Sequence, residues 1–320
     1  MRRDEIENIL RAKDSTILDF PERGPWGDSR YRGNCSGFIQ AFLIWKYKVK
    51  KMAELFAGSG TGYDVARDMG ISYVGADLNP NPVRPGILQV DAFNDDVPEE
   101  FYGSDMVFMH PPYGAEIKIP YAGSMYPDPT GELSGKDLGQ MPWETFMNVL
   151  NRVVMKYYAA MEKGSYMGIL MGDVRRGGFH SMLADIVKPG QLEQIIIKKQ
   201  NNHMSAGRSY NNYNFVPIEH EYLMVLRKVM SLMISFNMPM KFESDIRDSK
   251  MGTWADVLQA VMSWIGNRPI HVEEIYGGIE GHEKTKSNLH WKEKVRQTLQ
   301  RYPKRFKSIG NGYWQLVNYG

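Results

Sequence analysis

Cysteine is almost absent from this sequence of 320 residues, in which Cys35 is the single example. An internal disulfide and a zinc site built from several cysteines are therefore excluded. The sequence also lacks any apolar run of about twenty residues, the length that a membrane-spanning helix needs. Residues 1–5 carry charges of both signs where a secretory signal needs an apolar core. These absences predict a cytoplasmic protein with no membrane partner.

A strong net charge is lacking as well. The formal charge is +2 at pH 7, which by itself says little about nucleic acid. The basic residues are nevertheless concentrated near the C-terminus, where positions 283–307 hold nine Lys and Arg residues against Glu283 and Glu293. With 42% hydrophobic and 24% charged residues, the chain is long enough for one large α/β domain and a smaller second domain.

The most informative stretch is residues 54–62, Glu-Leu-Phe-Ala-Gly-Ser-Gly-Thr-Gly. The apolar residues in 51–56 predict a strand, in which the acid Glu54 is out of place without a partner, and the glycines predict a turn that opens a helix. In such a turn the backbone N–H groups can closely approach a nucleotide-like cofactor, although turns of this kind also bind NAD, FAD or phosphates. The stretch therefore predicts a cofactor site.

Three further motifs follow the ends of predicted strands. Asp77 closes the strand 72–76, Asp91 closes the third strand, and His110-Pro111-Pro112-Tyr113 follows the strand 104–109. Open α/β sheets bind ligands at the edge where the carboxyl ends of their strands meet. The two prolines fix φ and hold their turn rigid. The pattern therefore predicts a single site at this edge of the sheet.

In this order, the motifs resemble the S-adenosylmethionine-dependent DNA amino-methyltransferases, over roughly residues 25–228. Enzymes of this family methylate the exocyclic nitrogen of adenine or cytosine. The resemblance implies an α/β catalytic domain of residues 1–229 with a Rossmann-like class I methyltransferase sheet. It also implies S-adenosyl-L-methionine as cofactor, S-adenosyl-L-homocysteine as product, and no metal.

The resemblance assigns the cofactor contacts as well. A loop ahead of the glycine turn covers the methionine end of the cofactor, Asp77 accepts the two ribose hydroxyls, and Asp91 accepts the adenine amino group. The residues implied are Asn34, Cys35, Ser36, Phe56, Ala57, Gly58, Ser59, Gly60, Asp77, Leu78, Asp91 and Ala92. For Ser36 and the two acids, a purely structural role as helix caps stays open.

The same resemblance assigns catalysis to His110, Pro111, Pro112 and Tyr113. In the family, the residue before the prolines and the first proline's carbonyl accept the hydrogens of the target amino group, while the aromatic residue stacks on the base. His110 departs from the pattern, because the family usually has Asp or Asn here for adenine and Ser for cytosine. A neutral imidazole has one acceptor nitrogen. We therefore expect activity to fall as the pH drops through the histidine pKa.

The target is open between several classes. The order of the motifs, with a recognition unit last, favours adenine N6 over cytosine N4, and Cys35 lacks the preceding proline that is typical of cytosine C5 methylation. Pro-Pro-Tyr after such a cofactor motif also occurs in RNA guanine-N2 and protein glutamine methyltransferases. A DNA-binding regulator that retains an inactive methyltransferase fold is a further alternative.

Two loops carry candidate contacts to DNA. The polar loop 201–215 resembles the family region that packs on a flipped base, with Tyr213 or Phe215 as the stacking residue, although either aromatic could belong to the core. Arg175 and Arg176 follow the strand 165–171, where they could contact phosphates or pair with Asp173. The long Gly- and Pro-rich segment up to residue 141 is expected to order on DNA or substrate binding.

The last part of the chain has a pattern of its own. After a linker at 230–252, helices are predicted at 254–265, 272–276 and 289–301, followed by a hairpin at 306–317 around Gly310-Asn311-Gly312. This order resembles a winged helix-turn-helix over residues 253–320, which implies double-stranded DNA as partner. Lys292, Arg296 and Gln297 are candidates for base contacts, and a solvated basic face or a protein-binding surface is the alternative.

The resemblance implies a prokaryotic or phage-encoded protein. It leaves open whether a cognate restriction endonuclease is a partner. The oligomeric state and the recognition sequence are not determined by these patterns.

Overall fold

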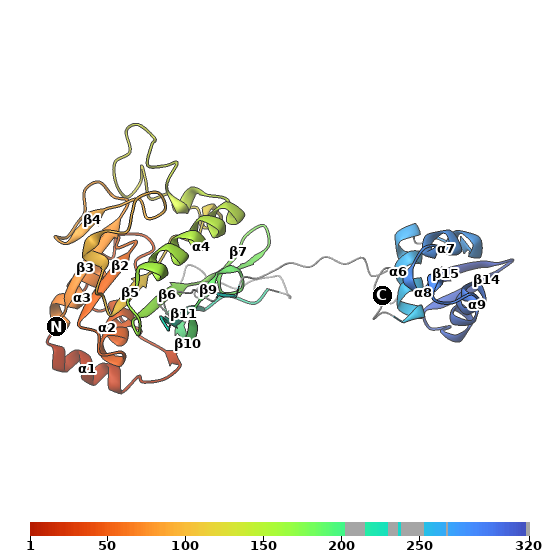
Figure 1. Cartoon of the computed structure of the whole chain (residues 1–320), viewed down its shortest axis with the longest axis horizontal. Helices are drawn as coiled ribbons and strands as arrows, with labels where there is room; N and C mark the ends of the chain where they lie inside the picture. The colour runs from red at the N-terminus through yellow and green to blue at the C-terminus, as the bar shows by residue number, and fades with distance from the viewer. Residues whose placement is uncertain (202–214, 230–235, 238–252, 267, 318–320) are drawn as a thin grey trace. The chain divides into compact units, whose positions relative to one another are not determined.

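The computed structural model describes residues 1–201, 215–229, 236–237, 253–266 and 268–317. The chain divides into two compact units, Met1–Pro239 and Met240–Gly320 (Figure 1). In the described parts of the chain, none of the helices combines the length and the apolar character needed to cross a membrane.

The first unit is built on an eight-stranded sheet in the order β1-β10-β11-β6-β5-β2-β3-β4. Five neighbouring strands are parallel: β2 (Lys51–Leu55), β3 (Ser72–Asp77), β4 (Ile87–Gln89), β5 (Met106–Met109) and β6 (Tyr166–Met171). The other three are β11 (His220–Arg227), antiparallel to β6, β10 (Gln191–Lys199), antiparallel to β11, and β1 (Ile17–Leu18), parallel to β10. From β2 the chain continues to β3 and β4 on one side of the sheet, and from β5 it continues to β6 on the other side. The carboxyl ends of β2 and β5 therefore mark the switch point at which such sheets bind ligands.

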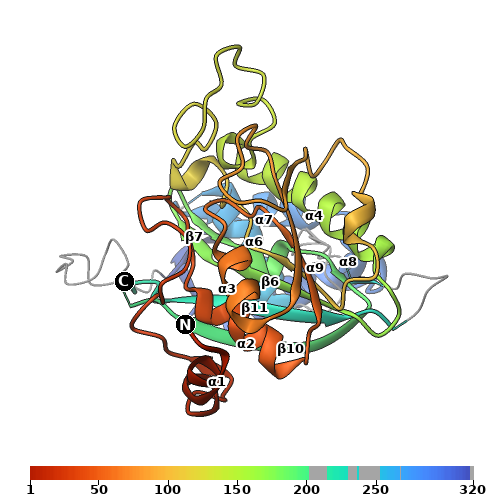
Figure 2. The same ribbon diagram turned by 90° about the vertical axis from the view of Figure 1, so that its left-hand side faces the viewer.

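Helices cover both faces of the sheet. Helices α1 (Arg3–Arg11), α2 (Gly37–Lys46) and α3 (Thr61–Met69) pack on one face, and α4 (Trp143–Ala160) packs on the other. Figure 2 shows α1 and α4 on opposite sides of the sheet. Strand β5 is therefore buried on both faces. Phe108 faces the α2 side, Met109 faces the α4 side, and both are fully buried. A strand covered on both faces reads as a continuous apolar run, which is why it is recognisable in the sequence.

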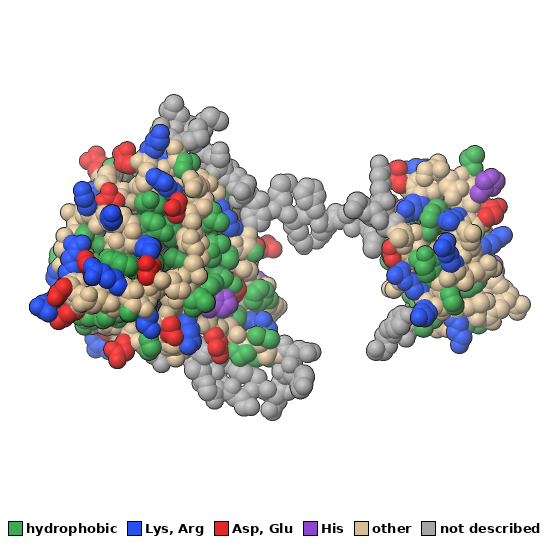
Figure 3. All heavy atoms as spheres, turned by 90° about the horizontal axis from the view of Figure 1, so that it is seen from below, with side chains coloured by type: hydrophobic (Ala, Val, Ile, Leu, Met, Phe, Trp, Pro, Cys, Tyr) green, Lys and Arg blue, Asp and Glu red, His purple; other side chains and the backbone are tan. Residues whose placement is uncertain are grey.

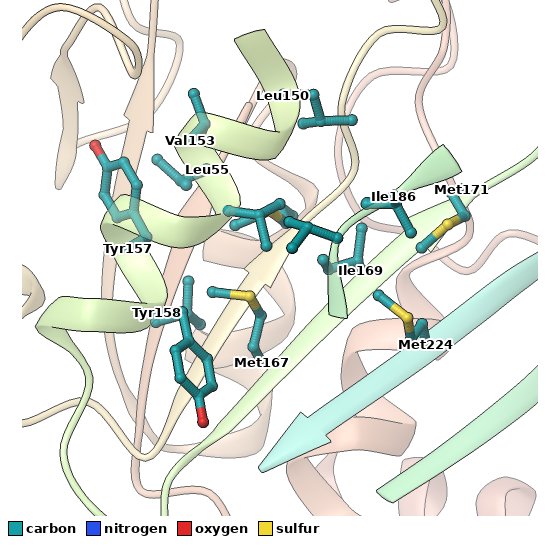
Figure 4. Close-up of a cluster of buried hydrophobic side chains, with 14 of the residues drawn as sticks. Leu55, Leu150, Val153, Tyr157, Tyr158, Met167, Ile169, Met171, Ile186 and Met224 are labelled. Atoms are coloured by element: carbon teal, nitrogen blue, oxygen red, sulfur yellow. The ribbon is translucent and has the colours of Figure 1, made fainter. Parts of the chain in front are cut away.

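Helix α4 anchors the second face. Along this helix Phe146, Leu150, Val153, Val154 and Tyr157 recur at helical spacing and are at most 1% exposed. Figure 4 shows Leu150, Val153, Tyr157 and Tyr158 of α4 beside Met167 and Ile169 of β6 and Met224 of β11. Each such fully buried side chain contributes roughly 1.5–3 kcal/mol to folding. This packing holds the carboxyl ends of β5 and β6 in place.

Short elements connect the main ones. They are η1 (Glu99–Phe101), η2 (Ala115–Ile117), η3 (Leu138–Gln140), β7 (Asp173–Arg175), β8 (Phe179–Ser181), α5 (Met182–Asp185), β9 (Lys188–Pro189) and β12 (Phe236–Asn237). The segment after β6, which the sequence predicted as a loop, forms the β7–β8 hairpin. Within the predicted linker 230–252, β12 pairs with β9, and the rest lies outside the described residues.

The second unit contains α6 (Trp254–Ile265), β13 (Ile270–His271), α7 (Val272–Ile279), α8 (Glu283–Lys286), α9 (Trp291–Arg301), β14 (Phe306–Gly310) and β15 (Tyr313–Leu316). Among the described residues of this unit, three strands pair in the order β13-β15-β14. Val257, Leu258, Val261, Ile275 and Leu299 form part of a separate core. The predicted hairpin is present, and Asn311 and Gly312 turn it with φ of 49° and 81°. Asn and Gly tolerate these angles best, which explains the strength of the sequence signal.

Candidate active site

The glycine turn joins the end of β2 to the start of α3. Phe56, Gly58 and Gly60 have φ of 60°, 48° and 76°, and Gly60 is the residue immediately before α3. A left-handed conformation at Phe56 is uncommon for a bulky residue and is typical of functional turns. The turn is further fixed because the N–H of Gly58 donates to Oδ2 of Asp77 at 2.8 Å.

A pocket of about 830 Å³, counted as all space between atoms and including open solvent, lies against this turn. We call it the glycine-turn pocket. Ten of the twelve residues expected at the cofactor line it: Asn34, Cys35, Phe56, Ala57, Gly58, Ser59, Asp77, Leu78, Asp91 and Ala92. The structure thus brings together residues from three strand ends and one loop. Their contact with a cofactor stays a prediction.

The other two expected residues lie elsewhere. Gly60 does not line the pocket and instead shapes the backbone at the start of α3. Ser36 lines a different pocket, and its hydroxyl donates to the carbonyl of Arg23 at 3.4 Å. Ser36 is the N-cap residue of α2, yet its side chain makes no capping hydrogen bond.

The two strand-end acids differ in what their carboxylates already bind. Asp77 is 8% exposed and accepts N–H bonds from Gly58 and Asn79; burial raises its pKa, and the backbone hydrogen bonds partly offset this. The Asp91 carboxylate accepts from the N–H groups of Phe93 and Asn94 and from the Asn94 amide. Asp91 therefore does cap the following turn, as its alternative role required, while still lining the pocket.

The loop ahead of the glycine turn is tied to α3. The hydroxyl of Thr61 donates to Oδ1 of Asn34 at 2.6 Å. The N–H of Gly27 donates to Asp64 at 3.0 Å, and Arg84 holds the same carboxylate with two hydrogen bonds. These contacts keep Asn34 and Cys35 on the pocket wall.

The long segment after Tyr113 supplies lining residues that the motifs did not indicate. Tyr121, Tyr126 and Asp137 of this segment line the glycine-turn pocket together with Tyr31. Asp137 is buried and accepts from the N–H groups of Tyr121, Ala122 and Gly139. The sequence offered one signal for Asp137, because it is an acid within a Gly- and Pro-rich segment. Acids of this kind organise turns by accepting hydrogen bonds from backbone N–H groups. The segment packs over the pocket in this structure, and its predicted response to DNA stays a prediction.

A second pocket of about 1140 Å³, again including open solvent, adjoins the first. We call it the Pro-Pro pocket, because His110, Pro111, Pro112 and Tyr113 all line it. Of the described residues, six line both pockets: Gly33, Asn34, Cys35, His110, Pro112 and Tyr121. Two ligands bound in these pockets would therefore meet at His110 and Pro112.

His110 belongs to a buried polar network that sequence motifs did not reveal. Its Nε2 lies 3.2 Å from the hydroxyl of Tyr113 and 3.8 Å from Oε1 of Glu221, and Glu221 pairs with Lys198 at 2.5 Å. Burial alone lowers the pKa of His110, but the thiol of Cys35 and the carboxylate of Glu221 outweigh it and raise the pKa to about 9. In the free protein, His110 therefore holds a second proton at neutral pH.

Glu54, the acid inside strand β2, has the partners that the sequence required. The Gln40 amide donates to its Oε1 at 2.6 Å, and the Tyr73 hydroxyl donates to its Oε2. Burial raises the pKa of Glu54 to about 8, although both hydrogen bonds act against it.

The candidate DNA contacts are spread over both units. Arg175 and Arg176 are exposed on the β7–β8 hairpin. Within the described residues Asp173 bonds the hydroxyl of Tyr222 and pairs with neither arginine. Phe215 lies 5.4 Å from the guanidinium of Arg175 and lines neither pocket, and Tyr213 lies outside the described residues.

On α9, Lys292, Arg296 and Gln297 are all exposed. Lys292 and Arg296 stand over the ring of Tyr276, at 5.2 and 5.7 Å from its centre. Figure 3 shows Lys and Arg side chains spread over the visible face of this unit.

The residues of the glycine-turn pocket fit S-adenosyl-L-methionine. Asp77 offers a buried carboxylate with lone pairs left for two hydroxyl donors, and Gly58 and Ser59 bring backbone close to the same space. No cluster of three or more His, Cys, Asp or Glu side chains suited to a metal occurs among the described residues.

Comparison with known proteins gives weak similarities. No family model and no curated protein matches the chain. Among solved structures, TrmN from Thermus thermophilus is 16% identical, with 62% of this chain and 50% of that chain covered and a TM-score of 0.38. An inferred DNA modification methylase, also from Thermus thermophilus, is 19% identical over 39% and 44% of the two chains, with a TM-score of 0.24.

The N-methyltransferase NodS from Bradyrhizobium japonicum, in complex with S-adenosyl-L-homocysteine, is 11% identical, with 71% of this chain and 97% of that chain covered and a TM-score of 0.36. The first two matches span half or less of those proteins. Similarities of this size do not assign an activity, which has to follow from the site itself.

Proposed function

We propose that this protein is an S-adenosylmethionine-dependent methyltransferase that methylates the exocyclic amino group of a base in double-stranded DNA, with adenine N6 as the preferred target. The observation that supports this most is the shared wall of the two pockets. His110 and Pro112 line both the glycine-turn pocket and the Pro-Pro pocket. A methyl donor in the first and a planar base in the second would meet there.

The glycine-turn pocket would hold the cofactor, which supplies a methyl group bound to a positively charged sulfur. Asp77 would accept the ribose hydroxyls, while Gly58, held by its hydrogen bond to Asp77, allows the backbone to approach closely. Asn34 and Cys35 would cover the end nearest the Pro-Pro pocket, because they line both pockets.

The Pro-Pro pocket would hold the base outside the DNA helix. The amino nitrogen of adenine or cytosine is a poor nucleophile, since its lone pair is delocalised into the ring. The carbonyl of Pro111 and a neutral His110 would accept its two hydrogens and aim the nitrogen at the methyl group, while Tyr113 packs against the base. Orientation of this kind supplies much of the rate, because it replaces a bimolecular encounter with a fixed geometry.

The choice between the two bases rests on sequence. The order of glycine turn, Pro-Pro-Tyr and a terminal recognition unit favours adenine, and cytosine N4 is the second candidate because the same acceptors would serve it. The family usually has Asp or Asn at this position for adenine and Ser for cytosine, so His110 does not distinguish the two bases.

For the second unit we propose a winged helix-turn-helix that binds DNA. Its strand order β13-β15-β14 and the helices α6, α7 and α9 support this. In this arrangement α9 would enter the major groove with Lys292, Arg296 and Gln297, and the β14–β15 hairpin would contact the backbone. Arg175 and Arg176 would add phosphate contacts near the base.

The test is to incubate the protein with methyl-labelled S-adenosylmethionine and unmethylated genomic DNA, and then to identify labelled nucleosides by mass spectrometry. Labelled N6-methyladenine supports the proposal, and labelled N4-methylcytosine replaces the target base while keeping the mechanism. If DNA stays unlabelled although the cofactor binds, the activity is not on DNA. RNA, protein and a purely regulatory role would then be tested in turn.

A further inference from the structure

Glu221 and Lys198 form a buried ion pair directly behind His110. They are directly paired across strands β10 and β11, and their Nζ and Oε2 atoms lie 2.5 Å apart. The side chains of Lys198 and Glu221 are 16% and 7% exposed. Removing both charges from water costs free energy, so an ion pair buried to this extent is not explained by stability alone. Its position at the end of the pocket wall indicates a role in the site.

The ion pair determines the direction of the hydrogen bonds. Burial by itself raises the pKa of Glu221, but the imidazole of His110 and the charge of Lys198 outweigh it and hold the pKa well below its usual range. Glu221 is therefore ionised and can only accept. The Tyr113 hydroxyl has one hydrogen and donates it to Oε1 of Glu221 at 2.7 Å. Its oxygen must then accept from Nε2 of His110 at 3.2 Å.

We propose that Glu221, held by Lys198 and acting through Tyr113, is a positioning residue that keeps the hydrogen of neutral His110 on Nε2. Nδ1 is then the only nitrogen of the ring that can accept a hydrogen bond. This inference rests on the proposed function, in which His110 must accept a hydrogen of the target amino group. With the opposite tautomer, Nδ1 would carry a hydrogen and repel the amino group.

Other titratable groups also face His110. Glu54 of β2 and Cys35 of the loop before α2 interact with it, in addition to Glu221 of β11. Cys35 also hydrogen-bonds the imidazole and raises its pKa. Glu221 differs from Cys35 and Glu54 because it acts on Nε2 through the Tyr113 hydroxyl.

The first readout is the tautomer itself, measured without any substrate. Long-range ¹H–¹⁵N spectra of protein labelled at its seven histidines distinguish a ring nitrogen with hydrogen from one without, and His110→Asn identifies the signals. Above pH 9 the wild type should show hydrogen on Nε2. In Glu221→Gln the new amide can donate to the phenol oxygen, which frees the Tyr113 hydrogen for Nε2. The tautomer should then shift toward Nδ1–H, and the pKa of His110 should fall by about one unit or more.

Three further variants keep this test interpretable. Lys198→Met removes the counter-ion of Glu221 and should shift the tautomer of His110 toward Nδ1–H, but less than Glu221→Gln does. Lys198→Arg keeps the positive charge and should preserve the wild-type spectrum. Asp105→Asn is the matched control: it makes the same carboxylate-to-amide change at the start of β5, where Asp105 accepts from the N–H groups of Lys50 and Lys51. An Nδ1–H wild type, or an unchanged His110 spectrum in Glu221→Gln, overturns the inference.

Methyl transfer provides the second readout. Above about pH 9, where His110 is neutral in both proteins, Glu221→Gln should lower kcat by roughly 10- to 100-fold, as expected for loss of an orienting partner, with little change in KM for the cofactor. The two proposals can fail separately. An Nε2–H tautomer in a protein that methylates no DNA overturns the proposed function and leaves the tautomer assignment standing. Methyl transfer by an Nδ1–H enzyme overturns only the role of Glu221.

Discussion

Oε2 of Glu54 occupies the space that a side chain at Gly62 would need. A Cβ built on Gly62 would overlap this oxygen and the carbon that carries it. The carboxyl cannot move aside, because Gln40 and Tyr73 both hold it. The first turn of α3 is therefore packed directly on a buried acid of β2.

Gly62→Ala should destabilise the first unit by about 1–3 kcal/mol, the usual cost of inserting an atom into a filled site. For a unit of this size, each kcal/mol lowers Tm by about 2–4 °C. Thermal unfolding followed by circular dichroism measures this. Gly135→Ala is the matched control, since the nearest atom to its Cβ would be a carbonyl at 3.5 Å. Equal Tm values for the two variants would contradict the packing argument.

Glu54→Gln should flatten the pH dependence of stability. The folded protein holds the Glu54 proton up to about pH 8, whereas the unfolded chain releases it near 4.5. The folded state therefore binds more protons across this window, and the free energy of unfolding falls as the pH rises through it. Urea unfolding at several pH values between these limits should show a shallower decline in the variant. Parallel profiles would exclude a raised pKa at Glu54.

Asp77→Asn should weaken cofactor binding more than Asp91→Asn. Asp77 alone would bind the ribose hydroxyls through a carboxylate, and a hydrogen bond to a charged group contributes roughly 1.5–3 kcal/mol, or about 10- to 150-fold in Kd. Most of the Asp91 carboxylate is already engaged in its own turn. Calorimetric titration with S-adenosyl-L-homocysteine measures both Kd values. A larger loss in Asp91→Asn would reverse the assigned roles.

Methyl transfer should increase with pH and level off above about pH 9. The sequence alone predicted that activity rises through the ordinary pKa of histidine. In the structure, burial, Cys35 and Glu221 together bring the pKa of His110 to about 9 in the free protein. Only the neutral ring can accept the amino hydrogen, so kcat/KM, which reports the free enzyme, should follow this titration. His110→Asn supplies an acceptor that does not titrate and should give a flat profile. The same slope in both proteins would remove His110 from the mechanism.

Lys292→Ala and Arg296→Ala should each weaken DNA binding and lower its salt dependence. Both side chains are cationic, so removing either from the major groove reduces the number of counterions released from the phosphates, which lowers the slope of log K against log salt by up to about 0.9. Fluorescence anisotropy with labelled duplex DNA at several salt concentrations measures the slope. Lys163→Ala is the control, because this exposed lysine precedes β6 at the sheet edge away from the pockets. Gln297→Ala should change sequence preference and leave the slope intact.

The sequence by itself determined the local parts of this protein. The apolar runs of β2, β3, β5 and β6, the glycine turn, the rigid Pro-Pro turn and the Asn-Gly hairpin are all readable, because each depends on residues within a few positions of one another. Strand ends of a parallel sheet also meet at one edge, so Asp77, Asp91 and His110 could be expected to lie near a common site. The sequence did not place Ser36 in the Pro-Pro pocket, nor did it predict the β7–β8 hairpin.

The tertiary structure alone decided what surrounds His110. Glu221 is 108 residues from Tyr113 in the sequence, and the two meet because β11 pairs with β6, which lies beside β5. Asp137 and the tyrosines of the long segment reach the glycine-turn pocket in the same way, through folding over distant strands. No local pattern encodes such partners, since a buried carboxylate looks the same in sequence whether it caps a turn, pairs with a lysine or orients an imidazole. The charge and tautomer of His110 therefore follow from strand pairing.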